Sequence, residues 1–273
     1  MPSYISGKFL LPLFALLILA ACGSDGDVVH TEDDADVLYN KAARALDEKQ
    51  YGEATQLFEE VERQHPYSQW ATQSQLMAAY AAYQGQRYDE AVLALDRFIQ
   101  LHPGNKDVDY AHYLRALSFY EQISDVRRDQ EMTKQAVESL DVLIRRFPDS
   151  RYTRDAKLKQ DLTLDHLAGK EMEVGRYYLE RANVGAAINR FRVVVKDYQT
   201  TTHAPEALHR LVESYLIVGL KDEAVRVAAV LGHNYPGSKW YKRSYGLLDP
   251  KQRKQLQEEG GWIDRTMDSL FKG

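Results

Sequence analysis

The sequence contains a single cysteine, and this scarcity excludes several kinds of site. Cys22 alone cannot form an internal disulfide, a cysteine-rich zinc site or a redox CxxC pair. Basic residues are also too few for a general nucleic-acid binder, because 35 Lys and Arg stand against 40 Asp and Glu, a formal net charge of −5. After Cys22 no apolar run approaches the roughly 20 residues of a transmembrane helix. We therefore expect a globular chain without nucleic acid as a partner.

The usual catalytic signatures are missing as well. The sequence has no GxSxG, HExxH, GxGxxG or Walker-type phosphate loop, and its acidic residues lack the spacing of a calcium loop. We therefore predict that the protein is not an enzyme and that it holds no metal and no cofactor. A lipid-anchored enzyme stays open only if reactive groups from distant parts of the chain come together, and no candidate group is evident.

The N-terminal segment gives the cysteine a specific setting. Lys8 precedes an apolar run at residues 9–20, and the segment LAACG at residues 19–23 resembles the bacterial lipobox. This predicts a lipoprotein signal peptide at residues 1–21 and a covalent lipid on Cys22, with an S-diacylglycerol and an N-acyl group. The alternative is an incidental cysteine after an ordinary cleavage site. Since one acyl chain binds a membrane only marginally, several chains would give a stable anchor.

The residues around the predicted anchor also indicate its location. Gly23 stands where an aspartate would favour retention in the inner membrane, so we expect an anchor in the cell outer membrane, on its periplasmic face. Residues 22–35 are rich in acidic residues and contain no aromatic residue, a composition typical of a flexible tether.

A pair of residues recurs along most of the remaining chain: an alanine followed twelve positions later by a proline. Apolar residues four and seven positions after each alanine form one buried helical stripe. The small alanine allows close helix packing, and proline ends the helix. A preceding helix completes each unit, predicted at residues 36–48, 69–84, 108–123, 151–183 and 203–218. The five pairs are Ala54/Pro66, Ala91/Pro103, Ala136/Pro148, Ala187/Gln199 and Ala224/Pro236.

This pattern resembles the tetratricopeptide repeat, whose period is about 34 residues. It predicts an all-α solenoid of five helix pairs, because a single pair cannot bury its own apolar face. We assign the extra length of the third unit to a charged connection at 124–132, and that of the fourth to a long first helix. Gln199, in place of proline, predicts a less sharply defined helix end. The predicted repeats are 36–68, 69–105, 106–150, 151–201 and 202–237.

Residues 238–273 are predicted to form a C-terminal capping extension, since the last repeat needs a covered end. The aromatic and apolar residues that suggest capping helices are Trp240, Tyr241, Tyr245, Ile263, Met267, Leu270 and Phe271.

Tyrosines are concentrated in the first helices of repeats one to three. Tyrosine offers apolar area and a hydroxyl with little rotamer entropy to lose, which suits the binding of an extended peptide. We predict a substrate-peptide groove with Arg97 and Arg115 as nearby cations. Two alternatives remain open: the rings pack between helices, and the arginines pair with local acids such as Asp96 or Asp109. The predicted groove tyrosines are Tyr39, Tyr80, Tyr83, Tyr110 and Tyr113.

Several blocks show a closer resemblance. The segments DRFIQLHP at 96–103 and DYAHYLRAL at 109–117 resemble the BamD (ComL) family of outer-membrane protein assembly lipoproteins. Further blocks agree in order and spacing: Arg128-Asp129, residues 147–152, Asp155-Ala156, Tyr177-Tyr178 and residues 186–191.

The resemblance implies a non-enzymatic, periplasm-facing subunit of the β-barrel assembly machine. It implies that the N-terminal repeats bind unfolded outer-membrane proteins. It also implies that the C-terminal repeats dock a periplasmic POTRA domain of the barrel protein BamA, alongside other assembly-machine lipoproteins. Asn189 and Arg190, early in the second helix of repeat four, are the predicted docking contact, with a local ion pair of Arg190 as the alternative. A different adaptor, one that scaffolds peptidoglycan enzymes, would use the same anchor and solenoid, and the 96–117 block argues against it.

Overall fold

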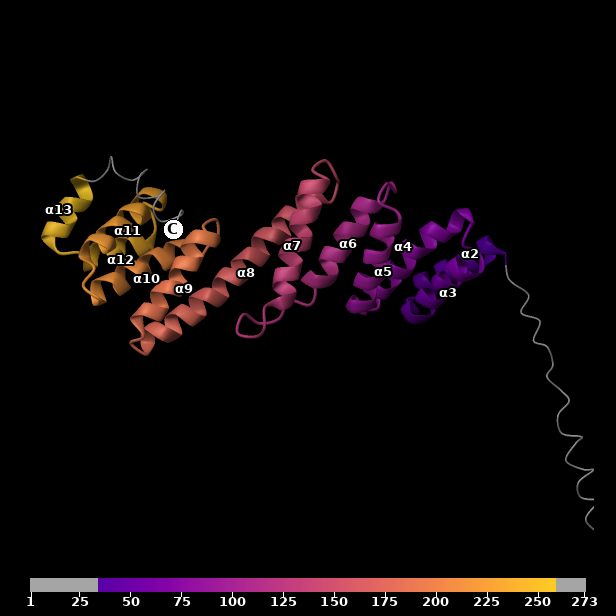
Figure 1. The fold of residues 1–273 in the computed structure, drawn as a ribbon, viewed down its shortest axis with the longest axis horizontal. Helices are drawn as coiled ribbons and strands as arrows, with labels where there is room; N and C mark the ends of the chain where they lie inside the picture. Colours follow the sequence, from indigo (N-terminus) through magenta and orange to yellow (C-terminus); the bar gives the residue numbers. More distant parts are fainter. Residues whose placement is uncertain (1–33, 259–273) are drawn as a thin grey trace, which may run out of the picture.

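The computed structural model describes residues 34–258, and over this range the chain is helical, with no strand. The first ten helices form five consecutive pairs, α2/α3 to α10/α11, which follow one another along an elongated molecule (Figure 1). This confirms the predicted all-α solenoid. The predicted signal peptide, Cys22 and the tether up to residue 33 lie outside the described residues. The helices are α2 (Ala35–Asp47), α3 (Tyr51–Gln64), α4 (Gln69–Gln84), α5 (Tyr88–Leu101), α6 (Val108–Tyr120), α7 (Glu131–Arg146), α8 (Thr153–Glu180), α9 (Val184–Asp197), α10 (Ala204–Ile217), α11 (Lys221–Asn234), α12 (Lys239–Leu247) and α13 (Pro250–Glu258).

The second helix of every pair ends in the same way, including the one that lacks proline. The residues after α3, α5, α7, α9 and α11 have φ angles between −136° and −127°. The prediction that Gln199 blurs the end of α9 is therefore wrong. The physical reason is local hydrogen bonding: the Thr201 hydroxyl donates to the Tyr198 carbonyl at 2.7 Å, and the Tyr235 hydroxyl donates to the Gln199 carbonyl at 3.0 Å.

Most first helices end on a residue in the left-handed conformation. Lys49, Gln86, Ala182 and Gly219 have φ angles of 62°, 58°, 57° and 81°, and each follows a first helix closely. Their backbone N–H groups bond to the carbonyl three residues back, and the N–H group of the next residue bonds five residues back, which is the Schellman motif. The first helix of the third pair, α6, is different: Glu121 follows it with φ −65°, so the predicted helix at 108–123 extends three residues too far.

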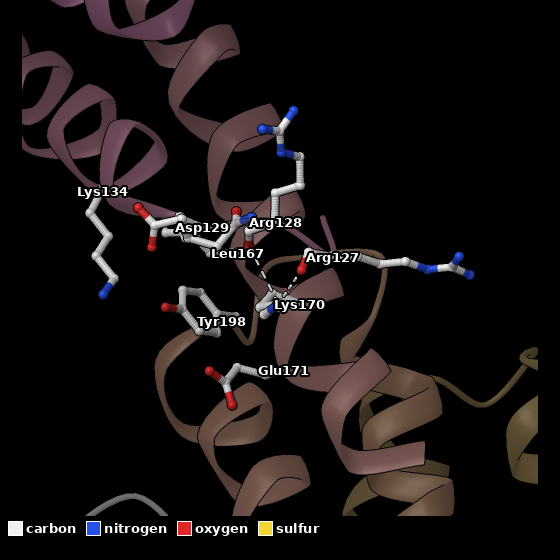
Figure 2. A pocket seen from close by; sticks show the side chains of 9 residues that line it. Arg127, Arg128, Asp129, Lys134, Leu167, Lys170, Glu171 and Tyr198 are labelled. Atoms are coloured by element: carbon white, nitrogen blue, oxygen red, sulfur yellow. Dashed lines mark hydrogen bonds between the residues drawn. The ribbon is translucent and has the colours of Figure 1, made fainter. Parts of the chain in front are cut away.

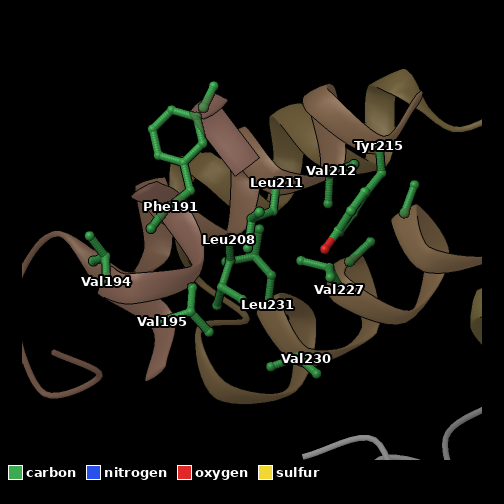
Figure 3. Packing of buried hydrophobic residues seen from close by; sticks show 14 of the residues in the cluster. Phe191, Val194, Val195, Leu208, Leu211, Val212, Tyr215, Val227, Val230 and Leu231 are labelled. Atoms are coloured by element: carbon green, nitrogen blue, oxygen red, sulfur yellow. The ribbon is translucent and has the colours of Figure 1, made fainter. Parts of the chain in front are cut away.

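The core is divided among the pairs rather than gathered at one centre. The five repeat alanines are fully buried, and so are the phenylalanines Phe58, Phe98 and Phe191 that follow three of them. Buried side chains group into separate clusters along the chain, and the largest joins α8 to α12 (Figure 3). Stability in such a molecule is approximately a sum over neighbouring units.

The long helix α8 links two parts of the solenoid. Its 28 residues form one uninterrupted helix, as predicted, although it starts and ends two or three residues inside the predicted limits. Ala156 near its start belongs to the cluster with α6 and α7, whereas Met172 near its end belongs to the cluster with α9 and α10.

Two short helices cover the C-terminal end of the last pair. The Ser238 hydroxyl caps α12 by accepting from the backbone N–H groups of Trp240 and Tyr241, at 3.2 and 3.1 Å. Trp240 packs against His209 of α10, with ring centroids 5.2 Å apart. Ser244 lies within hydrogen-bond distance of the same histidine, at 2.8 Å. Within the described residues, α12 and α13 therefore cover the end of the last pair. The apolar stripe from Ile263 to Phe271 lies outside the described residues, so the capping role of residues 238–273 as a whole stays a prediction.

A buried histidine at the interface between α6 and α7 makes the stability of the folded chain depend on pH. Burial, together with the nearby Arg146 and Arg115 cations, lowers the pKa of His112 to about 4. The unfolded chain, with a histidine pKa of about 6.5, binds a proton in this pH range that the folded chain does not. Stability should therefore fall as the pH drops from about 6.5 to 4.

We expect the free energy of unfolding, measured by urea titration, to be about 2 kcal/mol lower at pH 4.5 than at pH 7 through this group. His112→Gln should reduce this dependence on pH and leave the part contributed by His209, whose pKa burial also lowers. Parallel losses in the wild type and the variant would contradict the prediction.

Candidate functional site

Five tyrosines, four from two successive first helices and one directly before the third, share one surface, which we call the tyrosine face. Tyr80 and Tyr83 come from α4, Tyr110 and Tyr113 from α6, and Tyr152 directly precedes α8. The Tyr152 ring stacks on Tyr113, with centroids 4.8 Å apart and an interplanar angle of 16°, and it lies 5.2 Å from Tyr110. Tyr80, Tyr83 and Tyr110 pack against a common apolar cluster. The structure therefore brings four of the five predicted tyrosines together and adds Tyr152.

Three hydroxyl groups of this face, those of Tyr83, Tyr110 and Tyr113, have raised pKa values and stay protonated at neutral pH. Burial raises the pKa of Tyr83 to about 12, and the Glu121 carboxylate beside it acts in the same direction. Burial also raises the pKa of Tyr110 and Tyr113. The Tyr113 hydroxyl donates to the Asp155 carboxylate at 2.6 Å. The face thus combines ring surface with phenol oxygens, a mixture that can contact apolar side chains and polar backbone groups alike.

An open pocket of about 390 Å³ lies between α6 and α8, beside the tyrosine face. Glu121, whose carboxylate raises the pKa of Tyr83, is one of the residues that line this pocket. Leu158 and Leu162 are one helical turn apart on α8 and are 59% and 61% exposed. Apolar surface therefore continues from the rings onto α8, and the lining residues of the pocket are Tyr120, Glu121, Ile123, Ser124, Leu162, Thr163 and His166.

Tyr39, the fifth predicted tyrosine, packs among three helices. Its ring lies 4.5 Å from the Trp70 ring of α4 and 5.4 Å from the Phe58 ring of α3. Burial raises its pKa. Tyr39 therefore packs between neighbouring helices, which is the alternative that the sequence left open for these rings.

The two predicted arginines lie apart from the tyrosine face. Arg97, on the second helix α5, pairs with Glu62 of α3 at 2.5 Å. The side chain of Arg115 pairs with Asp96 at 2.5 Å and donates to the Ser139 hydroxyl at 2.6 Å. Arg115 follows Tyr113 by two residues, so the two side chains leave α6 about 200° apart. The prediction that both arginines line the groove is therefore wrong. Each pairs with an acidic residue of the solenoid, which is the alternative that the sequence left open.

The cations beside the tyrosine face are residues that the sequence analysis did not single out for this role. Lys159 pairs with Asp155 at 2.8 Å, and its Nζ lies 5.6 Å from the centre of the Tyr120 ring. The guanidinium of Arg151 lies over the Tyr152 ring at 4.7 Å. The sequence feature that could have identified Arg151 is its position next to Tyr152, directly before the long helix and within the block at 147–152 that carries the family resemblance.

The predicted docking residues lie on the far half of the solenoid. Asn189 and Arg190 are both exposed on α9. Arg190 Nη1 contacts Glu171 Oε2 of α8 at 3.1 Å, so the local ion pair left open by the sequence is present. Asn189 lines a shallow pocket of about 200 Å³ together with Arg192, Val193, Val195, Lys196 and Leu211.

Glu171 also borders a larger pocket of about 440 Å³, where the α6–α7 connection meets α8 and the end of α9 (Figure 2). Lys170 Nζ donates to the carbonyl oxygens of Arg127 and Arg128, at 3.0 and 3.4 Å. These bonds hold the connection on α8. Figure 2 shows the guanidinium groups of both arginines directed away from Lys170, with Tyr198 to its left and Glu171 below it. The pocket is therefore mixed in charge and next to the predicted docking residues.

Residues 34–258 contain no cluster of three or more His, Cys, Asp or Glu side chains arranged to hold a metal ion. Within the same range, none of the helices has the length and apolar character needed to cross a membrane.

Comparison with known proteins identifies relatives over most of the chain. Residues 31–231 match the YfiO family, described as an outer membrane lipoprotein. A protein of Caulobacter vibrioides named outer membrane protein assembly factor BamD is 50% identical over 222 residues, covering 81% of this chain and 73% of the relative. A protein of the same name from Rickettsia prowazekii is 47% identical over 242 residues, covering 88% and 96%. Among solved structures, the TPR2AB domain of yeast Sti1 in complex with pHSP90 covers 87% of this chain and 97% of its own, at 11% identity and a TM-score of 0.40.

Proposed function

The chain belongs to the YfiO family of outer membrane lipoproteins, and from this membership we propose that it is a non-enzymatic subunit of the β-barrel assembly machine. In this role it binds unfolded outer-membrane proteins and docks on BamA to promote barrel insertion. The observation that carries the substrate-binding part is the tyrosine face, where five rings from three successive helix pairs form one surface.

Extended outer-membrane segments suit this surface for a physical reason. Transmembrane β-strands alternate apolar and polar side chains over about ten residues, with aromatic residues near their ends. The alternate side chains of such a segment can lie on the rings of Tyr83 and Tyr113. Its free backbone N–H groups can donate to the phenol oxygens, because the proton of the Tyr113 hydroxyl is already directed to Asp155. The exposed Leu158 and Leu162 extend the apolar surface for further side chains.

The proposed function also includes a lipid anchor and a docking contact with BamA. A covalent lipid on Cys22 would hold the protein on the periplasmic face of the outer membrane, and the acidic tether would let the solenoid reach its partners. Asn189 and Arg190 would meet a periplasmic POTRA domain of BamA, and other lipoproteins of the machine would bind elsewhere on the solenoid. Asn189 and Arg190 are exposed and lie beside two open pockets, which supports this docking position.

The substrate-binding part is tested by removing one ring of the tyrosine face. Tyr83→Ala in the full-length protein should weaken binding of a ten-residue peptide of alternating polar and aromatic residues by about tenfold, because one buried ring contact is lost. Tyr83→Phe keeps the ring and should stay within about threefold of the wild type. The measurement is fluorescence anisotropy of the labelled peptide.

The matched control is Tyr177→Ala, which removes a half-exposed tyrosine from the other end of α8. This variant should bind the peptide as the wild type does, and thermal melting should show that all variants are folded. Equal affinity of Tyr83→Ala and Tyr177→Ala would contradict a binding role for the tyrosine face.

A further inference from the structure

The turn between α10 and α11 exposes large apolar side chains to water. Ile217 is 63% exposed, and Val218 and Leu220 are each 47% exposed. Gly219 between them has a φ angle of 81°, and the Leu220 N–H donates to the Tyr215 carbonyl at 2.9 Å, so hydrogen bonding fixes the shape of the turn. The exposure of these three side chains is therefore a property of the folded turn.

The solenoid itself does not require apolar residues at this turn. Three other helix pairs have a turn with a left-handed residue at the same position, and these turns carry no large apolar residue. An exposed apolar group in one of four equivalent turns indicates a binding surface rather than a need of the fold. The sequences are EKQ at 48–50, GQR at 85–87 and RAN at 181–183, against VGL at 218–220.

The turn between α12 and α13 lies next to this one and enlarges the surface. Lys221 Nζ, at the start of α11, lies 3.9 Å from Asp249 Oδ2. Leu247 at the end of α12 is 47% exposed, whereas Leu248 is buried in the largest cluster and holds the turn in place. The four exposed side chains form what we call the terminal apolar patch, at the end of the molecule opposite to α2 (Figure 1): Ile217, Val218, Leu220 and Leu247.

The helices beside the patch are strongly basic. Residues 239–254 contain six Lys and Arg against one acid, Asp249, in a chain whose total charge is −5. Lys242 and Lys251 are exposed, and neither forms an ion pair within residues 34–258. Arg253 holds α13 against α12, because its Nε donates to the Tyr245 carbonyl at 3.2 Å. The cap therefore presents positive charge that the described part of the chain does not neutralise.

An aromatic ring lies among these cations. Lys239 Nζ lies 4.9 Å from the centre of the Trp240 ring, and the guanidinium of Arg243 lies 5.0 Å from it. Trp240 is half-buried, so part of the ring faces solvent. Tryptophan together with Lys and Arg is the combination that is enriched where proteins meet the head groups of a membrane.

The composition of this surface favours a lipid membrane over a protein partner. Lysine is depleted in protein–protein interfaces, whereas surfaces that lie on membranes combine Lys and Arg with exposed leucine and tryptophan. Four of the six cations at residues 239–254 are lysines. Their charge is complementary to that of anionic lipid head groups.

We propose that the terminal apolar patch and the basic residues of α12 and α13 bind the surface of a membrane that contains anionic phospholipids. The apolar side chains would enter the boundary between head groups and acyl chains, and Lys242 and Lys251 would lie at the level of the phosphates. The inference goes beyond the proposed function, in which the lipid on Cys22 is the attachment to the membrane. A second contact at the opposite end would lay the solenoid along the membrane.

The test measures binding of the mature chain, residues 22–273, to vesicles by co-sedimentation. Cys22→Ser prevents lipid attachment, so that binding reports the protein surface alone. One set of vesicles is phosphatidylcholine, and the other also contains about 30% phosphatidylglycerol. The anionic vesicles should bind the protein at least about tenfold more tightly, and about 0.5 M salt should shrink this ratio, since salt screens exposed charges.

Three changes in the surface should alter binding to the anionic vesicles in predictable directions. Ile217→Ser combined with Leu220→Ser should weaken it about tenfold, because apolar burial is lost. Lys242→Gln combined with Lys251→Gln should weaken it about tenfold and leave binding to neutral vesicles unchanged. Asp222→Asn removes an exposed acid next to the patch and should strengthen binding about threefold.

The matched controls are Leu93→Ser on α5 and Lys157→Gln on α8, which change exposed residues far from the cap. Both should bind vesicles as the parent protein does, and thermal melting should show that every variant is folded.

Two kinds of result would overturn the inference. Equal binding to the two sets of vesicles, or binding to neither, would exclude a contact with anionic membranes. Tight binding to the anionic vesicles that the patch and lysine variants retain would place the contact elsewhere in the chain. Since the assay contains neither BamA nor a substrate peptide, its failure leaves the proposed function intact.

Discussion

Substitution of Phe191 by alanine is expected to lower the free energy of unfolding by about 3–5 kcal/mol, the range for removing a fully buried phenylalanine. Its ring lies in the largest apolar cluster, between α8 and α10 (Figure 3). It packs directly on the backbone of α8 at Gly175, where a Cβ atom would stand only 2.4 Å from the ring. The cavity left by alanine is closed in by helices on several sides and so cannot collapse easily. The measurement is urea unfolding of the full chain, followed by circular dichroism.

The control is Leu93→Ala on α5, where the side chain is 72% exposed and the expected loss is under about 0.5 kcal/mol. Because the core is divided into clusters, hydrogen exchange should show the effect of Phe191→Ala in α8 to α11 and little change in α4 and α5. A loss below about 1 kcal/mol would show that the ring contributes much less than its burial implies.

The solenoid could be predicted from sequence because its determinants are local. An alanine, an apolar stripe and a proline lie within one helix, so their spacing alone predicts a helix and its end. The ends of the first helices could not be predicted in this way. Three of the left-handed positions carry Lys49, Gln86 and Ala182 rather than glycine, and backbone hydrogen bonds that close the helix end accompany the conformation there.

The candidate site also has some features with local determinants, which can be predicted from sequence, and others that depend on distant residues. Tyr80, Tyr83, Tyr110 and Tyr113 reach one surface because the repeat register places them on equivalent helix faces. The partners of Arg97 and Arg115 depend on which side chains of other helices lie opposite, and no spacing within the chain reveals this. Arg151 and Tyr152 fall inside the helix predicted at 151–183, but the groove tyrosines were sought only in repeats one to three, and the observed helix starts at Thr153.

The helix α8 connects the two proposed binding regions. Asp155 near its start accepts from the tyrosine face, and Glu171 near its other end pairs with Arg190 of α9. Sixteen residues at 1.5 Å each separate these two acids by about 24 Å. A single uninterrupted helix therefore holds the two proposed regions at a fixed separation, and the extra length of the fourth repeat lies in this helix.

Reversal of one charge at the docking region should have the second large effect. Arg190→Glu is expected to weaken binding to the purified periplasmic region of BamA by about 30-fold or more, since a truncated or reversed interface charge typically costs 2–5 kcal/mol. The fold should tolerate the change, because the pair between Arg190 and Glu171 is partly exposed and such pairs contribute about 0–1 kcal/mol to stability. The affinity is measured by calorimetry, and Arg145→Glu on α7, which breaks a comparable exposed pair with Asp141, serves as the matched charge control.

A swapped variant separates the docking role of Arg190 from its local ion pair. Arg190→Glu combined with Glu171→Arg restores opposite charges across α8 and α9 but exchanges their positions. If Arg190 contacts the partner directly, the swapped protein should bind BamA as weakly as the single variant does. If the pair matters only because it positions α9 on α8, the swap should restore binding, and the contact with BamA would then have to lie elsewhere on the solenoid. Unchanged affinity of Arg190→Glu itself, with the fold intact, would remove Arg190 from the interface.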